Sequence, residues 1–379
     1  MVLENTNSSI MFKLWSIFCH RRHVIALILA SFLFLCVLVL FQRLNAELAK
    51  SAFAPERSST PNIPAPVTQH RPESTKQRRS TNSPTTSTEP SLSSSSTSQS
   101  STALNVVEVV EPSSFLVQNE TFDCITARLV AMAFPICVYA ADTDIWVSSI
   151  LVRGGYFESE EVIRLMHLLQ LDRRLQFVDI GANIGVHSLP IARLCEVLAV
   201  EPNSRSMARL AKAVVLGTVS SNITLVHNAI SNVRTTLNMG VEWNNQGHAF
   251  LINGTECKST ETGQPCTTSS QTTTILLDDL LPLMRSTAAL LKVDVESHEI
   301  NVFTESSAGQ FFEQIDVPLV FMEWVFHRHR SPEIVQRLLE FFYSRNYVVF
   351  DTHNFRLQMP YRNWPDNILF KKSSYTTPF

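Results

Sequence analysis

Beyond about residue 105, short apolar runs alternate with segments whose apolar residues recur every three or four positions. The short runs are rich in Val, Ile, Leu and Phe and have the length of buried β-strands. The helical segments are SRSMARLAKAVVLG and SPEIVQRLLEFFYSR, and Pro332 begins the second, where proline is favoured. This alternation predicts an α/β, doubly wound fold, with a mostly parallel sheet between helices. The predicted strands are Leu175–Ile180, Val197–Glu201, Ile223–Ile230, Ala289–Val295, Val317–Trp324 and Tyr347–Asp351.

The N-terminal part of the chain has a different pattern. Val24–Phe41 contains no charged residue and is near the lower length limit for a helix that crosses a bilayer. Lys13, Arg21 and Arg22 precede this run, which predicts a cytosolic N-terminus and a lumenal or extracellular remainder. We therefore expect an uncleaved signal-anchor in a single-pass type II membrane protein. The alternative is a cleaved signal peptide, because Ala52–Ala54 has the small-residue spacing that signal peptidase requires.

The segment that follows is polar and of low complexity. Sixteen of the twenty-two residues from Thr81 to Thr102 are Ser or Thr, and such a segment cannot bury enough surface to offset the entropy of ordering it. The sequence therefore predicts a cytosolic tail (1–23), a transmembrane helix (24–41), a disordered stem (42–104) and a globular domain (105–379).

Charge and glycosylation signals narrow the expected partners. The net charge is −3, and the basic cluster Lys76–Arg79 lies in the polar segment, so nothing predicts nucleic-acid binding. Three Asn-x-Ser/Thr triplets, at Asn119, Asn222 and Asn253, agree with a lumenal domain. A short tail, one membrane helix, a Ser/Thr/Pro stem and a lumenal domain are typical of many Golgi enzymes, so we expect the Golgi.

Five of the seven cysteines lie in the predicted lumenal part, where disulfides form. Cys257 and Cys266 bracket a short polar insert and are the pair that we expect to be joined. A bond between Cys124 and Cys137 is a less favoured alternative, and Cys195 is expected to be a buried thiol. No spacing of the zinc-binding kind occurs in the sequence.

A glycine pair follows the first predicted strand, in the stretch LQFVDIGANIG. Gly181 and Gly185 allow a sharp turn and a close approach to a ligand, and a helix is expected to begin near Ile184. Glu201 ends the next strand, where it can accept hydrogen bonds from ribose hydroxyls. Asn183 stands where a dinucleotide-binding motif has its middle glycine, which excludes that motif. The pattern therefore predicts a nucleoside-containing ligand.

These motifs resemble those of the FkbM family of S-adenosylmethionine-dependent methyltransferases. FVDIGANIGVHSLPIA and LAVEPN are similar to its first two motifs, and TTTILLDDLL and LLKVDVESHEINVF to a later pair. GGYFESEEVIRL resembles the segment before the first motif, and the whole resemblance spans Asp144 to Lys371. Two positions depart from the family pattern: Ser297 replaces a glycine, and Pro190 lies inside the expected first helix.

The resemblance implies a Rossmann-like methyltransferase fold that binds S-adenosylmethionine. The cofactor-binding residues it implies are Asp179, Gly181, Asn183 and Gly185 at the methionine end, Glu201 at the ribose, and Asn228, within His227–Ile230, near the adenine.

The segment DVESHE follows a central strand and is the expected catalytic region. Asp294 or His298 would remove a proton from an acceptor hydroxyl, with Glu296 also assigned to the catalytic set. Glu296, Glu299 and Glu323 would orient the base or hold a divalent metal, although the first turn of a helix explains Glu299 by itself. Because such a domain in the secretory lumen meets glycans and glycoproteins, we expect O-methylation of a glycan hydroxyl.

Two other functions are weighed against this one. Asp142 and Asp144 form an Asp-x-Asp pair, which in a Golgi glycosyltransferase would bind a nucleotide-sugar through a metal ion. The segment DIWVSSILVRGGYFE after it is instead interpreted as a strand pair leading into the methyltransferase domain. A non-catalytic, partner-binding protein of the same fold is the third hypothesis. The insert from about Gly240 to Gln271 is expected to form loops that recognise the acceptor.

Overall fold

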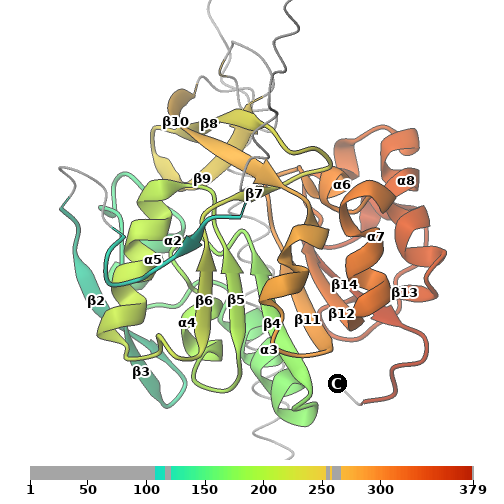
Figure 1. Ribbon diagram of the computed structural model, residues 1–379, viewed down its shortest axis with the longest axis horizontal. Coiled ribbons are helices and arrows are strands. Elements are labelled where there is room, and N and C mark those ends of the chain that lie inside the picture. The colour runs from blue at the N-terminus through green and yellow to red at the C-terminus, as the bar shows by residue number, and fades with distance from the viewer. Residues whose placement is uncertain (1–106, 116–120, 253–256, 258–265, 378–379) are drawn as a thin grey trace, which may run out of the picture. The chain divides into compact units, whose positions relative to one another are not determined.

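The computed structural model describes residues 107–115, 121–252, 257 and 266–377, all within one compact unit, Ser96–Phe379. Its centre is an eight-stranded sheet in the order β1-β6-β5-β4-β11-β12-β14-β13 (Figure 1). These strands are β1 (Val109–Val110), β4 (Leu175–Ile180), β5 (Val197–Val200), β6 (Ile223–Val226), β11 (Ala288–Val293), β12 (Asp316–Glu323), β13 (Tyr347–Asp351) and β14 (Asn367–Lys372).

The middle of this sheet is parallel, as the sequence predicts. β6, β5, β4, β11 and β12 run in the same direction, whereas β14 is antiparallel to both of its neighbours and β1 is antiparallel to β6. Strand order reverses between β4 and β11, because the chain first builds outward from β4 and then returns to its other side. Ligands of such sheets bind beyond the carboxyl ends of the strands at this reversal.

Both faces of the sheet are buried, in two separate hydrophobic cores. Alternate residues of one strand point to opposite faces, so Phe177 of β4 joins one core and Val178 joins the other. The first core is closed by α2, α3, α4 and α5, and the second by α6, α7 and α8. The bounds are α2 Val147–Val152, α3 Ser159–Leu171, α4 Ser188–Ile191, α5 Ser204–Leu216, α6 Glu299–Val302, α7 Glu305–Gln314 and α8 Pro332–Tyr343, with short 3-10 helices at Leu277–Leu283, His327–His329 and Tyr361–Asn363.

Two of the long helices, α5 and α8, match the helical segments that the sequence predicts. Asn203 caps α5 by accepting a hydrogen bond from the Arg205 backbone N–H at 3.0 Å. Pro332 is the first residue of α8, where its missing N–H costs no helical hydrogen bond.

The insert that the sequence predicted as loops is a second sheet. β8 (Thr236–Glu242), β9 (Asn245–Ile252) and β10 (Thr267–Ile275) are antiparallel neighbours, and β10 also pairs with β7 (Ala229–Ile230). The loop prediction is therefore wrong for these segments. The threonines of β10 look polar in sequence, but threonine is β-branched and favours strands. The predicted strand Ile223–Ile230 is likewise divided, because β6 and β7 belong to different sheets.

A hairpin of β2 (Cys124–Leu129) and β3 (Met132–Cys137) packs on the first core. Cys124 lies directly opposite Cys137 in this hairpin, and the two form a disulfide. The predicted bond between Cys257 and Cys266 is confirmed as well. Cys195 is a free, partly buried thiol.

Two local predictions near the first motif are wrong. The segment expected to form a strand pair before Gly154 contains α2 instead, because the Asp144 carboxylate caps a helical turn there. The helix expected from Ile184 is reduced to α4, a single turn that includes Pro190. Proline lacks an N–H and restricts the backbone before it, which agrees with so short a helix.

None of the helices in the described ranges is both long enough and apolar enough to span a bilayer. The predicted transmembrane helix (24–41), the stem (42–104) and the triplets at Asn119 and Asn253 lie outside the described residues, so they stay predictions.

Candidate functional site

The candidate site is a pocket at the carboxyl ends of β4, β5 and β11. The turn after β4 forms its floor, and residues of the second sheet, including Met239, Gly247 and Leu251, form its opposite wall. Figure 1 shows the second sheet above the carboxyl ends of these strands. The pocket encloses about 800 Å³ of space, including the open solvent at its mouth.

Three side-chain contacts attach the second sheet to the rest of the domain around the pocket. Asn183 donates from its side-chain amide to the Gly247 carbonyl at 3.1 Å, and Arg205 donates to the Gln246 side chain at 2.6 Å. Across the pocket, the His248 Nε2 atom lies 2.9 Å from a Glu296 carboxylate oxygen. These contacts fix the second sheet where it lines the pocket opposite the main sheet.

Gly181 is required where it stands. Its φ of +85° lies in the left-handed region, and a Cβ atom there would be 1.7 Å from the Asp294 carbonyl oxygen. The two strand ends, β4 and β11, can therefore approach one another only if residue 181 has no side chain. Gly185 also has a positive φ, of +93°, and a Cβ atom there would lie 2.5 Å from the Leu210 side chain of α5. Gly185 therefore packs against this helix and does not line the pocket.

Asn183 and Glu201 form the second part of the floor. The Asn183 and Asn203 backbone N–H groups each donate to one Glu201 carboxylate oxygen, both at 2.7 Å. Each oxygen keeps lone-pair capacity for a further donor, such as a ribose hydroxyl. Burial raises the pKa of the Glu201 carboxyl to about 7, against the opposing effect of these two N–H donors.

Asn228 lines the pocket, but its side chain has structural partners. Its amide oxygen accepts from the Glu108 backbone N–H at 2.8 Å, and its amide nitrogen donates to the Thr273 carbonyl at 3.1 Å. The residue thus ties the main sheet to β10. The same pocket is lined by the apolar side chains of Ile230 and Leu251, which suit a flat heterocycle.

A buried group of charges lies on the other side of Gly181, around Lys292 of β11. The Lys292 ammonium donates to the Gly181 carbonyl at 3.0 Å and to Asp294 at 3.2 Å, and it lies 3.6 Å from Asp179. Burial disfavours its charge, but Asp294, Asp179 and Glu158 together raise the pKa of Lys292 above its usual value. Asp179 is fully buried, accepts from the Ser188 hydroxyl, and does not line the pocket.

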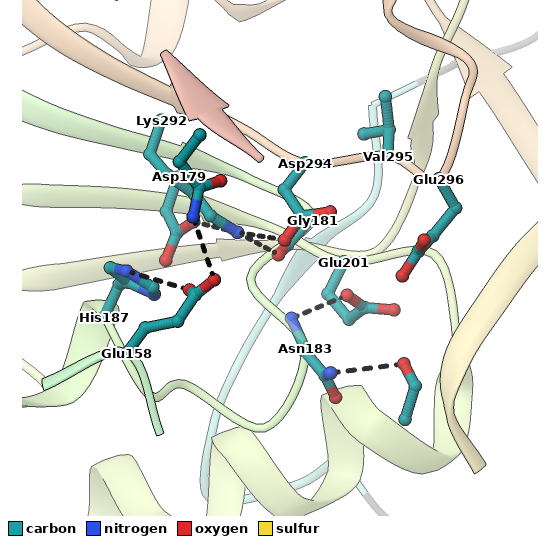
Figure 2. Close-up of polar contacts among 12 residues, drawn as sticks. Glu158, Asp179, Gly181, Asn183, His187, Glu201, Lys292, Asp294, Val295 and Glu296 are labelled. Carbon is teal, nitrogen blue, oxygen red and sulfur yellow. Dashed lines mark hydrogen bonds and ion pairs between the residues drawn. The ribbon is translucent and has the colours of Figure 1, made fainter. Parts of the chain in front are cut away.

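Glu158 and His187 face one another beside this group (Figure 2). Glu158 Oε2 lies 3.6 Å from His187 Nε2, and Glu158 Oε1 accepts from the Asn367 side chain at 3.3 Å. Both residues line the pocket. Burial raises the pKa of the Glu158 carboxyl to about 7, and burial together with Lys292 lowers the pKa of His187 well below its usual value.

The segment after β11 makes a tight bend. Glu296 and Ser297 have φ values of +54° and +73°, so Ser297 adopts the left-handed conformation that a glycine would favour there. His298 lies in the pocket wall, with Nε2 2.9 Å from the Ser231 hydroxyl and Nδ1 3.1 Å from the Asn301 amide. Burial lowers the pKa of His298, which keeps the ring neutral.

Three carboxylates meet at the ends of β11 and β12. Asp294, Glu296 and Glu323 each offer an oxygen within 4.8 Å of the others, a donor set that Mg²⁺ or Ca²⁺ accepts. Exposed or half-buried acids also gather without an ion, so this set alone does not establish a metal site. Glu299 does not join it, because its carboxylate binds His327 at 2.9 Å and the Val295 backbone N–H at 3.0 Å.

The Asp-x-Asp pair is not part of the pocket. Asp144 is fully buried, and its carboxylate accepts from the Val147 and Ser148 backbone N–H groups and from the Ser148 hydroxyl at 2.6 Å. Asp142 is exposed. These two acids do not converge on one ion, and the glycosyltransferase hypothesis loses the feature that supported it.

Most of the sequence-predicted site residues therefore meet in one pocket. Those that line it are Gly181, Asn183, Glu201, Asn228, Asp294, Glu296 and His298. Asp179 and Gly185 do not line the pocket: Asp179 lies beside Lys292, and Gly185 packs against Leu210. Sequence reasoning missed Glu158, His187 and Lys292. Lys292 could have been noticed as the one charge inside an otherwise apolar strand, and Glu158 belongs to a segment that already matched the family pattern.

Comparison with known families identifies one match. Residues 179–349, just under half of the chain, match the family described as the Methyltransferase FkbM domain. This agrees with the motif resemblance and places Gly181, Glu201 and Asp294 inside the matched region. No curated protein sequence matches the chain.

Several of the similar solved structures are methyltransferases. They include precorrin-6y C5,15-methyltransferase from Geobacter metallireducens, with 13% identity over 57% of this chain and 88% of that one and a TM-score of 0.29. An S-adenosylmethionine-dependent O-methyltransferase from Thermotoga maritima has 11% identity over 66% and 78% and a TM-score of 0.31. An O-methyltransferase from Bacillus cereus, in complex with S-adenosylhomocysteine, has 11% identity over 55% and 80% and a TM-score of 0.29. Similarities this weak assign neither a substrate nor a reaction.

Proposed function

We propose that this protein is an S-adenosylmethionine-dependent methyltransferase, on the basis of its FkbM-domain match and its pocket. The observation that carries the proposal is the pairing of two features at one strand-order reversal. Gly181 opens the floor between β4 and β11, and Glu201 presents a buried carboxylate beside it. A nucleoside ligand needs both features, because its ribose must be held while its reactive end passes close to the backbone.

The pocket residues fit this cofactor. Glu201 can accept from ribose hydroxyls while it keeps its two backbone donors, and Ile230 and Leu251 offer apolar contact to an adenine ring. S-adenosylmethionine supplies a methyl group that its positive sulfonium makes electrophilic. At the other end, Glu158, Asp179 and Asp294 outnumber Lys292, and this negative balance suits a ligand that carries positive charge.

A hydroxyl acceptor fits the same end of the pocket. Methyl transfer needs alignment of two groups and removal of one proton, and a sugar hydroxyl has a high pKa, so a base must stand close by. Several carboxylates lie there within one wall, including Asp294 and Glu296. This crowding supports O-methylation over transfer to an atom that carries no proton.

The acceptor that we propose is a glycan hydroxyl in the secretory lumen, within the Golgi. This part of the proposal rests on the sequence: an apolar run at Val24–Phe41, a Ser/Thr-rich segment behind it, and Asn-x-Ser/Thr triplets in the remainder. The two disulfides, Cys124–Cys137 and Cys257–Cys266, support an oxidising compartment. Glycans and glycoproteins are the acceptors available there.

The test combines binding with product analysis on the purified full chain. Calorimetry should show binding of S-adenosylmethionine and of S-adenosylhomocysteine, and no binding of nucleotide-sugars. Glycans from cells that overproduce the protein should gain the mass of a methyl group relative to cells that lack it. Cofactor binding with methyl transfer only to lipids or small molecules would reject the glycan acceptor and keep the enzyme class. Binding without any transfer, together with a retained protein partner, would favour the non-catalytic hypothesis.

A divalent ion at Asp294, Glu296 and Glu323 is a finer proposal, tested separately. If an ion assists, a chelator should abolish turnover and added Mg²⁺ or Mn²⁺ should restore it, with cofactor binding unchanged. Full activity after exhaustive chelation would show that a carboxylate acts alone.

A further inference from the structure

One carboxylate in the pocket has a position that capping and packing do not explain. Glu158 is the N-cap residue of α3, yet its side chain caps no backbone N–H of that helix. Its φ is +50°, a left-handed conformation that is uncommon for a residue with a side chain. Such backbone outliers cluster at functional sites, where the surrounding structure holds them in place.

The structure holds Glu158 from three directions and aims it into the pocket. Tyr156, two residues before it, donates its hydroxyl to the Val186 carbonyl at 2.5 Å, which fixes this segment against the residue next to His187. His187 Nε2 lies 3.6 Å from one carboxylate oxygen, and Asn367 of β14 donates to the other. The Glu158 side chain nevertheless stays 23% exposed, so a ligand can reach it.

The other candidate bases are engaged more tightly. Asp294 is bound to the Lys292 ammonium at 3.2 Å, so one of its oxygens already has a partner. Both nitrogens of the His298 ring have partners, Ser231 and Asn301. Glu296 contacts His248 of the second sheet at 2.9 Å, which assigns it to closure of the pocket.

The charges around Glu158 suit a base that works near neutral pH. Lys292 of β11 and Asp294, just after that strand, act on it. His187 faces it from the segment after β4, Glu161 acts on it from its own helix, and Asn367 of β14 is a neutral donor. Burial outweighs Lys292 and raises the pKa of the Glu158 carboxyl to about 7. General bases are most effective when their pKa lies near the working pH.

We propose that Glu158 is the catalytic residue that accepts the proton of the acceptor hydroxyl, an assignment that rests on the proposed function. The acceptor oxygen forms a bond to the methyl carbon as the bond from that carbon to sulfur breaks. The electron pair of the broken bond goes to sulfur, which leaves as the neutral thioether of S-adenosylhomocysteine. The hydroxyl proton goes to Glu158, which becomes a neutral carboxylic acid. His187 and Asn367 are positioning residues for this carboxylate.

The test is Glu158→Gln in the full chain, which keeps the size and polarity of the side chain and removes its basicity. With glycans released from cells that lack the protein as acceptor, turnover at saturating cofactor should fall by on the order of a hundredfold to ten-thousandfold. Cofactor affinity by calorimetry should be nearly unchanged. In the parent, turnover should rise as pH rises through about 7, because only ionised Glu158 accepts a proton, and the variant should lose this rise.

Two matched variants and one acceptor-free measurement complete the experiment. Glu160→Gln changes an exposed acid of the same helical turn and should leave turnover unchanged. Asp294→Asn should lower turnover less than Glu158→Gln does. An infrared titration without acceptor should show protonated carboxyl signals that disappear near pH 7, from Glu158 and Glu201, and Glu158→Gln should remove one of them.

Three results would overturn the assignment. Full turnover in Glu158→Gln, with an active parent, rejects Glu158 and leaves the proposed function standing. A large loss of cofactor affinity with normal turnover at saturation would make Glu158 a cofactor ligand instead. A parent that binds cofactor but transfers no methyl group to any acceptor rejects the proposed function, and the base assignment with it.

Discussion

Glu201 carries the sharpest binding prediction of any single residue in the pocket. It receives two backbone N–H donors from the turns around it, so its carboxylate is fixed in position before a ligand arrives. A group held in this way contributes to affinity without a further loss of side-chain entropy. Burial of the Glu201 carboxyl raises its pKa to about 7.

Glu201→Ala should weaken binding of S-adenosylmethionine tenfold to a hundredfold, which corresponds to about 1–3 kcal/mol for polar groups left without a partner. In the parent, affinity should fall as pH drops through about 7, because protonation of Glu201 removes acceptor capacity at the ribose. Calorimetry across this pH range checks both statements. Glu196→Ala, at an exposed ion pair with Arg285 on the opposite end of β5, is the control. Equal losses in the two variants would remove Glu201 from the cofactor site.

At the scale of elements, the site depends on how closely the ends of β4 and β11 approach one another. The two strands pair in parallel from Ala288 opposite Leu175 to Val293 opposite Ile180, and the Asp294 backbone N–H then donates to the Ile180 carbonyl at 3.0 Å. This pairing continues past the strand ends, so the Asp294 carbonyl lies against Gly181. The turn and the acidic segment are thus one rigid unit.

Gly181→Ala should disrupt this unit, because its Cβ would lie 1.7 Å from the Asp294 carbonyl oxygen and backbone would have to move. Gly154→Ala is a matched control: Gly154 also has a φ of +85°, but a Cβ there meets nothing within 4 Å. The control should lose only about 1–2 kcal/mol of unfolding free energy, from the left-handed conformation alone. Urea denaturation should show a clearly larger loss for Gly181→Ala, together with loss of cofactor binding. Comparable losses would mean that the close approach is unimportant.

At the scale of the whole molecule, the open question is the compartment in which the pocket works. The disulfides and the proposed anchor point to the secretory lumen, and N-glycosylation provides a direct readout of that location. Of the three triplets, only Asn222 lies in the described part of the chain. Its side-chain amide donates to the Ala192 carbonyl at 2.9 Å, and an attached glycan would remove that bond.

The protein should therefore carry N-glycans on Asn119 or Asn253 in preference to Asn222. When it is produced in cells with a secretory pathway, a peptide N-glycosidase should reduce its apparent mass on gels. Asn119→Gln and Asn253→Gln together should abolish this shift, and Asn222→Gln should leave it intact. A chain that shows no shift and whose pocket domain is digested by protease outside intact microsomes would contradict the lumenal orientation.

The amino-acid pattern alone predicts the central sheet, and it predicts the positions of Gly181 and Glu201, which line the pocket. β4 and β13 have the bounds that their apolar runs predict, because short runs that contain β-branched and aromatic residues favour a strand that packs on a core. Gly181 and Glu201 could likewise be recognised from the sequence near each of them. Each is fixed by a local requirement, a tight turn in one case and an acid at a strand end in the other.

Which side chains meet in the pocket follows from the three-dimensional arrangement of the strands and helices. Lys292, Glu158 and His187 come from three separate segments, and local periodicity carries no information on which strand will lie beside which helix. The second sheet was missed because its burial comes from its position over the pocket and not from apolar composition. The contacts of Gly185 with Leu210 and of the Asp144 carboxylate with the first N–H groups of α2 could not be predicted for a related reason. A glycine or an acid looks the same in the sequence whether it packs a helix, caps one or binds a ligand, and only its neighbours in space distinguish these uses.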